Sequence, residues 1–136
     1  MRIEDQCVSL ELARRLKELN LKQNSLFNWH DIDSFYPCVR HEDYIPERSG
    51  DFILSAFSVA ELGEILPRLL HKNGVGYFLE IFKDVDENWH IKYEGYIDNK
   101  LIQIYSLNEA NARAKMLIHI IENNLVTEEW RKQWLI

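Results

Sequence analysis

The chain has 136 residues, and its 22 acidic and 16 basic side chains give it a formal net charge of −6. This length predicts a single globular domain over residues 1–136. The acidic charge argues against nucleic acid or an anionic membrane as the main partner, because both need a basic protein surface.

The first quarter of the chain predicts one helix and one strand. A leucine stripe at helical spacing predicts a helix over residues 10–19, with Ser9 as its N-cap. Asn20 suits the left-handed position that follows the last turn of a helix. A short strand is expected next, over residues 26–30.

Residues 31–51 are predicted to form an irregular loop that carries much of the net charge. Two basic and six acidic side chains give this stretch a charge of −4. A loop of this length is uncommon in a compact domain and is often functional. Four apolar or aromatic side chains are expected to attach it to the body of the domain, namely Phe35, Tyr36, Tyr44 and Ile45.

The second helix has the clearest start signal in the sequence. Ser58 and Glu61 stand at the spacing of a capping box, in which each side chain bonds the backbone N–H of the other. The helix is predicted over residues 59–66 and is expected to stop or kink at Pro67. The cationic side chains within residues 68–72 are expected to lie at the end of this helix.

The centre of the chain predicts an antiparallel β-meander with strands over residues 76–83, 89–97 and 101–105. The second of these strands alternates apolar and polar side chains, so one of its faces is expected to be buried and the other solvated. In the first strand, Phe78 and Phe82 lie opposite other apolar residues. Either helices cover both faces of the sheet, or one face meets another subunit.

A long helix is predicted over residues 107–123, with Ser106 and Glu109 as a second capping box and Asn108 as the alternative cap. Thr127 is expected to cap a final short helix. The order of elements predicts an α+β domain in which an antiparallel meander of about three to four strands packs against three to four helices.

Three segments carry a resemblance to known proteins: CVSLELARRLKELNLKQNSLFNW, SAFSVAELGEILP and NEANARAKMLIHIIENNLV. Together they resemble a family of small bacterial proteins that are often encoded in phages and prophages and have no assigned activity. The resemblance covers 55 of the 136 residues. It implies a cytoplasmic protein associated with mobile DNA, and it implies no catalytic residue. The chain departs from the family pattern at Asn20, where a glycine is expected.

The sequence also favours a cytoplasmic location on physical grounds. No apolar run approaches the roughly 18 residues of a membrane span, and the first residues lack the apolar stretch of a secretory signal. Cys7 and Cys38 are too few for a disulfide framework, so we expect both to be reduced thiols.

Metal binding or catalysis is the alternative function that the sequence leaves open. Cys38 and His41 have a Cys-x-x-His spacing, and His30 precedes them, so these three side chains could hold part of a zinc site. A structural zinc site normally needs a second such pair, which the sequence lacks. The alternatives for residues 30–43 are therefore a small enzyme or metal site, or a solvated acidic loop. We expect no cofactor.

Aromatic side chains are the main candidates for contacts with other proteins. Trp130 and Trp134 stand one turn apart in the last helix, where they either anchor a partner or dock the helix onto its own domain. Phe78 and Phe82 are the other candidates. The leading hypothesis is a non-enzymatic, phage- or prophage-associated accessory protein that binds another protein, as a monomer or a homodimer.

Overall fold

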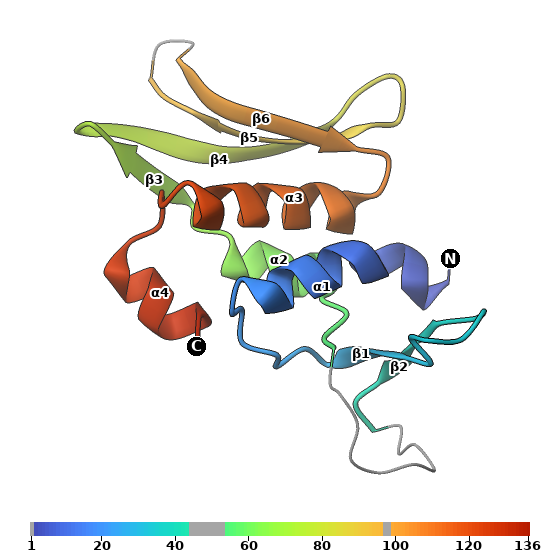
Figure 1. The fold of residues 1–136 in the computed structure, drawn as a ribbon. Coiled ribbons are helices and arrows are strands. Elements are labelled where there is room, and N and C mark those ends of the chain that lie inside the picture. The colour runs from blue at the N-terminus through green and yellow to red at the C-terminus, as the bar shows by residue number, and fades with distance from the viewer. Residues whose placement is uncertain (1, 44–53, 97–98) are drawn as a thin grey trace.

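A computed structural model gives the chain an α+β fold (Figure 1). The residues that it describes are 2–43, 54–96 and 99–136. Within them, four α-helices and one short 3-10 helix, Ile3–Gln6, combine with two antiparallel sheets of two and four strands. The fold class predicted from the sequence is confirmed. None of the helices in these residues is long and apolar enough to cross a membrane.

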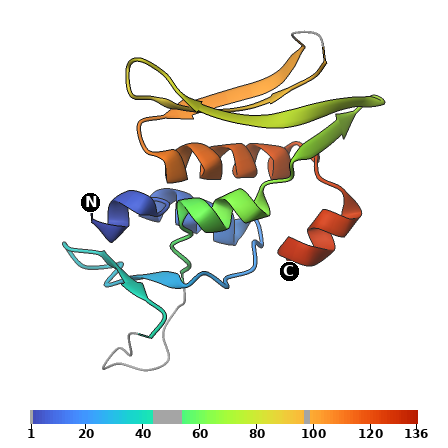
Figure 2. The same ribbon diagram turned by 180° about the vertical axis from the view of Figure 1, so that it is seen from behind.

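The helix α3 (Glu109–Glu122) is the central layer of the fold. It packs against the larger sheet on one side and against α1 (Leu10–Glu18) and α2 (Val59–Ile65) on the other (Figures 1 and 2). The last helix, α4 (Glu128–Trp134), lies beside this layer. All four α-helices of the described residues are on the same side of the larger sheet, so none of them covers its other face.

The larger sheet is a meander with the strand order β3-β4-β5-β6. Its strands are β3 (Leu69–Lys72), β4 (Val75–Lys83), β5 (Trp89–Glu94) and β6 (Lys100–Ser106). The last three correspond to the predicted strands. The predicted alternation of β5 is confirmed, because Ile91 and Tyr93 are fully buried and the side chains between them face outward.

The strand β3 corrects the prediction for residues 68–72, which were expected to end a helix. The helix α2 ends before Pro67, and β3 then pairs with the start of β4. The two residues between these strands, Asn73 and Gly74, both have positive φ values, of 53° and 78°. That is the backbone of a type I′ turn, which joins two antiparallel strands directly.

A second, smaller sheet corrects part of the prediction for residues 31–51. It is a hairpin of β1 (Phe27–His30) and β2 (Cys38–His41). The strand β2 forms within the expected loop because the buried Val39 packs with Cys7 and Ala56 in a small second core. Residues 44–51, with Tyr44 and Ile45, lie outside the described residues.

Three of the predicted helix caps are present. The hydroxyl oxygens of Ser9, Ser58 and Thr127 each accept a hydrogen bond from a backbone N–H in the first turn of their helix. In α3, the alternative cap forms: the Asn108 side chain accepts from the N–H of Asn111 at 2.9 Å. The Ser106–Glu109 capping box is absent because Ser106 is still part of β6.

The helix ends follow one pattern. Asn20 and Asn124 follow α1 and α3 with φ values of 68° and 53°, and this left-handed conformation was expected for Asn20. After Asn20, the N–H of Leu21 donates to the carbonyl of Leu16 at 3.1 Å. This bond closes a Schellman motif, in which the chain folds back on the last turn of the helix.

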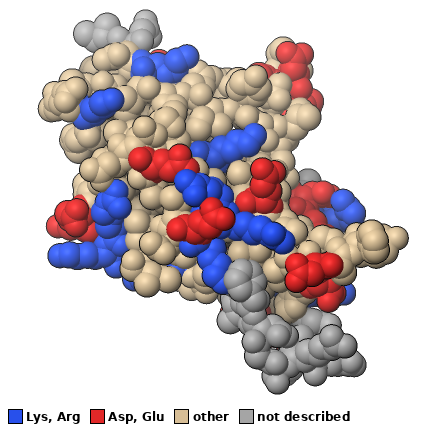
Figure 3. Space-filling view, in the orientation of Figure 1, with Lys and Arg blue, Asp and Glu red and all other residues tan. Residues whose placement is uncertain are grey.

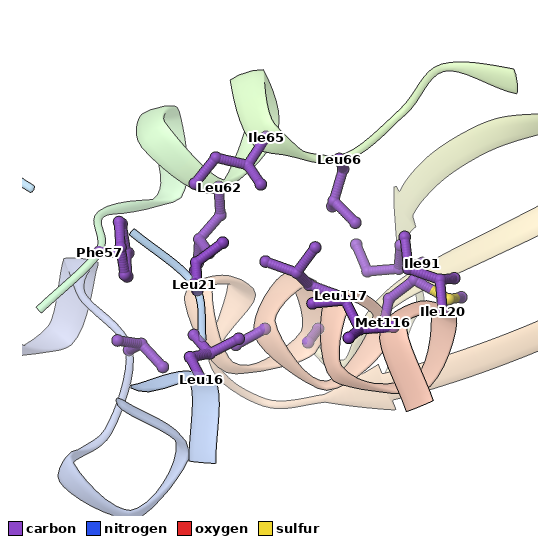
Figure 4. Close-up of a cluster of buried hydrophobic side chains, with 14 of the residues drawn as sticks. Leu16, Leu21, Phe57, Leu62, Ile65, Leu66, Ile91, Met116, Leu117 and Ile120 are labelled. Atoms are coloured by element: carbon purple, nitrogen blue, oxygen red, sulfur yellow. The ribbon is translucent and has the colours of Figure 1, made fainter. Parts of the chain in front are cut away.

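One large core joins the sheet to the helices (Figure 4). Side chains from α1, α2 and α3 meet within it, and the inner face of the sheet closes it. The labelled members are Leu16, Leu21, Phe57, Leu62, Ile65, Leu66, Ile91, Met116, Leu117 and Ile120. Three alanines of α3 are also fully buried, which allows its neighbours to approach the helix closely: Ala110, Ala112 and Ala114.

The carboxylate of Glu61 connects this core to the hairpin. Its oxygen Oε1 accepts from the N–H of Ser58 at 2.9 Å and from the hydroxyl of Ser25 at 2.8 Å. Its other oxygen, Oε2, accepts from the N–H of Leu26 at 3.0 Å, one residue before β1 begins. One side chain therefore fixes both the start of α2 and the segment that leads into the hairpin.

We predict that Glu61→Ala lowers the free energy of unfolding by about 2–3 kcal/mol, because it removes a helix cap and two further hydrogen bonds to a charged group. Urea denaturation at neutral pH measures this change. Glu64→Ala, on the same helix, is the matched control and is expected to change stability by less than about 0.5 kcal/mol. Equal losses in the two variants would contradict this assignment.

Candidate functional site

The structure does not bring the three candidate metal ligands together. His30 and Cys38 are directly paired across the hairpin, whereas His41 pairs with Phe27 at its other end. Cys38 and His41 are three residues apart on one strand, so their side chains point to opposite faces and stand about 10 Å apart along it. Among the described residues, no group of three or more His, Cys, Asp and Glu side chains could hold a metal ion.

The two cysteines have different environments. Cys7 is buried, and burial, with smaller contributions from the charges of Glu61 and Glu4, raises the pKa of its thiol to about 12. Cys38 is only partly buried, and its thiol lies 3.9 Å from a carboxylate oxygen of Asp31. The group beside this thiol is an acid, and not the histidine or cation that accompanies a nucleophilic cysteine. Neither cysteine is therefore set up as a nucleophile.

The turn of the hairpin presents two exposed aromatic side chains. Phe35 is 98% exposed and Tyr36 is 86% exposed, so the expectation that they attach this segment to the body is wrong. The turn itself is ordered by local hydrogen bonds. The N–H and hydroxyl of Ser34 donate to the carbonyl of Asp31, and the N–H of Tyr36 donates to the Ser34 hydroxyl. We call Phe35 and Tyr36 the hairpin tip.

Acidic side chains lie at both ends of the hairpin, in the turn beside the hairpin tip and at the base. The turn contributes Asp31 and Asp33, and the residues directly after β2 contribute Glu42 and Asp43. Arg40 is the one Lys or Arg side chain between residues 27 and 43. The hairpin therefore combines two exposed rings with a negative field.

The tryptophans of α4 are used within the domain. Trp130 is buried, and its indole N–H donates to the carbonyl of Ile65 at 2.8 Å. Trp134 is partly buried and packs against the main core. The backbone carbonyl of Trp134 also accepts a hydrogen bond from the N–H of Lys22 at 2.9 Å. Of the two alternatives for these tryptophans, docking onto the chain's own domain is the one present.

Phe78 and Phe82 lie on the open face of the larger sheet, which we call the outer sheet face. They are 50% and 39% exposed, and Tyr105 on β6 is 63% exposed on the same face. Tyr105 was not predicted from the sequence, although Gln103 and Tyr105 alternate with buried-face residues in β6 as the period of a strand requires. Two of the four strands, β4 and β6, thus contribute aromatic side chains to one partly apolar surface.

On this face, His90 of β5 lies in one row of paired residues, between Phe82 of β4 and Tyr105 of β6. Its ring stacks on Phe82 with the centroids 4.7 Å apart, and it lies 5.5 Å from the ring of Tyr105. Its nitrogen Nε2 is 2.6 Å from Asp84 and its Nδ1 is 2.9 Å from the amide nitrogen of Gln103. The oxygen of that amide accepts from Lys100, so the NH₂ group faces Nδ1 and the imidazole proton belongs on Nε2. Both ring nitrogens are therefore occupied.

The next row, in which Lys92 of β5 lies between Glu80 of β4 and Gln103 of β6, contains a charged cluster. Its ammonium is 2.7 Å from Glu94 and 3.2 Å from Glu80, and it lies 5.5 Å from the ring of Phe82. The hydrogen bond to Glu94, and then the one to Glu80, raises the pKa of Lys92. The hydrogen bond from Lys92 lowers the pKa of Glu94. Lys92 thus bridges two glutamates of the same chain and offsets part of their charge.

The helical side of the molecule shows no patch of one charge among the described residues in the view of Figure 3. Basic and acidic side chains alternate there, and several are paired. Arg15 on α1, for example, is 2.8 Å from Glu122 on α3 and 3.1 Å from Glu18. Nucleic-acid-binding proteins instead gather their basic side chains into a patch or stripe.

Comparisons of this chain with models of protein families, with curated proteins and with solved structures found no significant match. Two exposed surfaces, the hairpin tip and the outer sheet face, are therefore the candidates for functional contacts.

We predict that the two thiols react at very different rates. In the native protein at pH 8, a thiol reagent such as DTNB is expected to modify Cys38 and to spare Cys7, whose raised pKa and burial keep it protonated and inaccessible. Both thiols react once the chain is unfolded in urea. Cys38→Ser should abolish the native reaction, and rapid modification of Cys7 in that variant would contradict the assignment.

A second prediction concerns Asp84. The hydrogen bond from His90, followed by bonds from the backbone N–H groups of Asn88 and Asp86, lowers the pKa of Asp84. The stability that Asp84 contributes is therefore present above the ordinary aspartate pKa and is lost as the pH falls through the lowered value. Asp84→Asn should be less stable than wild type at pH 7, and the difference should shrink in acid.

Urea denaturation at several pH values between neutral and strongly acidic measures this difference. Asp86→Asn, in the same turn, is the control and is expected to show no comparable pH-dependent difference. A loss for Asp84→Asn that stays constant across the whole pH range would rule out the ionised carboxylate as the cause.

Proposed function

We propose that this chain is a non-enzymatic accessory protein that acts by binding another protein through its hairpin tip. The observation that carries this proposal is the near-complete exposure of Phe35 and Tyr36 on a hydrogen-bonded turn. Aromatic side chains that enter a pocket dominate many protein interfaces. Full burial of each ring would contribute about 1.5–3 kcal/mol, and an ordered turn limits the entropy lost on binding.

The charge of the hairpin indicates the chemistry of the partner. The acidic residues of the turn, Asp31 and Asp33, lie beside the hairpin tip and would oppose an acidic or phosphate-rich surface. They favour a partner with an apolar pocket whose rim carries Lys or Arg. Complementary charges of this kind mainly increase the association rate, and that increase falls as salt is added.

The cellular setting is proposed from the resemblance of the three segments described above. On that basis, the protein would act in the bacterial cytoplasm as a phage- or prophage-encoded factor, and its partner would be a host protein. The alternative of a small enzyme or metal-binding protein has no comparable support, because His30 and Cys38 lie apart from His41.

The test is affinity capture from a bacterial lysate with the tagged chain at near-native expression. We expect one protein to be retained specifically, and to be lost when Phe35→Ala and Tyr36→Ala are combined. The double variant should fold normally, because both side chains are almost fully exposed and make few contacts to lose. Retention should also weaken as the salt concentration rises.

The matched control combines Val85→Ala and Tyr96→Ala. These two apolar side chains are also highly exposed, but they lie beside the turns of the larger sheet. This variant is expected to retain the partner. Capture that is unchanged in the Phe35/Tyr36 variant, or no specific capture at all, would sink the proposal.

A further inference from the structure

We infer that the outer sheet face pairs with the same face of a second copy of this chain, around a two-fold axis that runs along the strands between β4 and β5. This inference concerns a surface other than the hairpin tip and does not depend on the proposed function. It rests on the register of the strands, the charges of the central row and the size of the face.

The register provides the charge complementarity. Glu80 on β4 and Lys92 on β5 are direct partners in the middle of the sheet. A two-fold rotation about an axis between these strands exchanges their positions, so β4 of one copy lies over β5 of the other. Each Glu80 then faces the partner's Lys92, and the contact occurs twice. The twist of stacked sheets displaces this row least, because the row lies near the middle of the paired strands.

The exposure of Glu80 agrees with this role, and the Lys92 side chain keeps 19% of its surface exposed. The Glu80 side chain is about half exposed, at 55%, although it already lies 3.2 Å from Lys92 within the chain. Its carboxylate can therefore accept a second ammonium without losing the first. The rotation also places the stacked pair of Phe82 and His90 over the same pair of the partner, so four rings meet in one row.

The charge of this face allows two copies to approach. The chain carries a net charge of −6, so two copies repel each other in general. On the outer sheet face, Lys92 and Lys100 offset Glu80 and Glu94, and Asp84 is bound to His90. Two copies therefore meet little repulsion when these faces approach each other.

The face is also large enough. Four strands spaced about 4.8 Å apart, with a rise of about 3.3 Å per residue, give it a width of roughly 20 Å and a length of about 20–25 Å. This footprint of roughly 400–500 Å² per copy is in the range of weak, reversible complexes, which bury less than about 1,200 Å² in total. Phe78, Phe82 and Tyr105 supply the apolar part of that area.

Sedimentation velocity across the micromolar range tests the inference with the full chain. Wild type is expected to form a dimer reversibly. Glu80→Lys places lysines opposite lysines, and Lys92→Glu places acids opposite acids, so each variant alone should be monomeric. An equimolar mixture of the two variants should dimerise again, because the lysine introduced at position 80 of one chain then faces the glutamate introduced at position 92 of the other.

Circular dichroism shows whether each variant is folded, and rescue in the mixture requires that both are. Glu11→Lys makes the same charge change on α1, on the helical side of the molecule, and should dimerise like wild type. A monomeric wild type at the highest concentration overturns the inference. So does a dimer that both single variants preserve, or a mixture of the two variants that stays monomeric.

Discussion

The burial of α3 on two sides is the constraint on which the rest of the structure depends. This helix carries seven buried residues along its 14, so it needs apolar cover both from the sheet and from the N-terminal helices. The inner face of the sheet supplies one side, with Ile91 and Tyr93 fully buried against the helix layer. The apolar faces of α1 and α2 cover the other side of α3. The helix α4 docks beside this layer through Trp130, so no helix of the described residues covers the outer sheet face. The aromatic rings of that face are exposed for this reason.

The hairpin depends on the core through a different kind of interaction. Few of its side chains enter the main core, so hydrogen bonds hold it in place: the Glu61 carboxylate binds Leu26, and the indole of Trp29 donates to the carbonyl of Val8 at 3.1 Å. Backbone bonds between Phe27 and Ala56 and between Trp29 and Leu54 complete the attachment. An element that is held mainly at its base can leave its turn in solvent, which is the situation of Phe35 and Tyr36.

Features that depend on neighbouring residues could be predicted from the sequence, whereas features that depend on distant ones could not. The caps at Ser9, Ser58 and Thr127 and the left-handed Asn20 each involve atoms within one turn. The strand β3 was missed because its cationic residues were assigned to a helix end, although Asn73-Gly74 is a strong local signal for a hairpin. The strand β2 was missed because its stability comes from Val39 packing on Cys7, 32 positions earlier. Which face of β4 stays open depends on the side from which α3 packs, and that is a property of the whole fold.

The polar groups of the outer sheet face explain how this surface can be exposed to water in one chain and still be buried in a contact. Within the same chain His90 bonds Asp84 and Gln103, and Lys92 bonds Glu80 and Glu94, which leaves one N–H of its ammonium for a further acceptor. Burial of this face would leave few donors or acceptors without a partner, and unpaired groups are the main cost of burying a polar surface. The hairpin lies on the other side of the helix layer from this face (Figure 1). Two copies joined through their sheets would therefore carry their hairpin tips at opposite ends, and a single assembly would present two binding elements. Such a bivalent arrangement increases the apparent affinity only for partners that both tips can reach at once, so the spacing of the tips would itself select the partner.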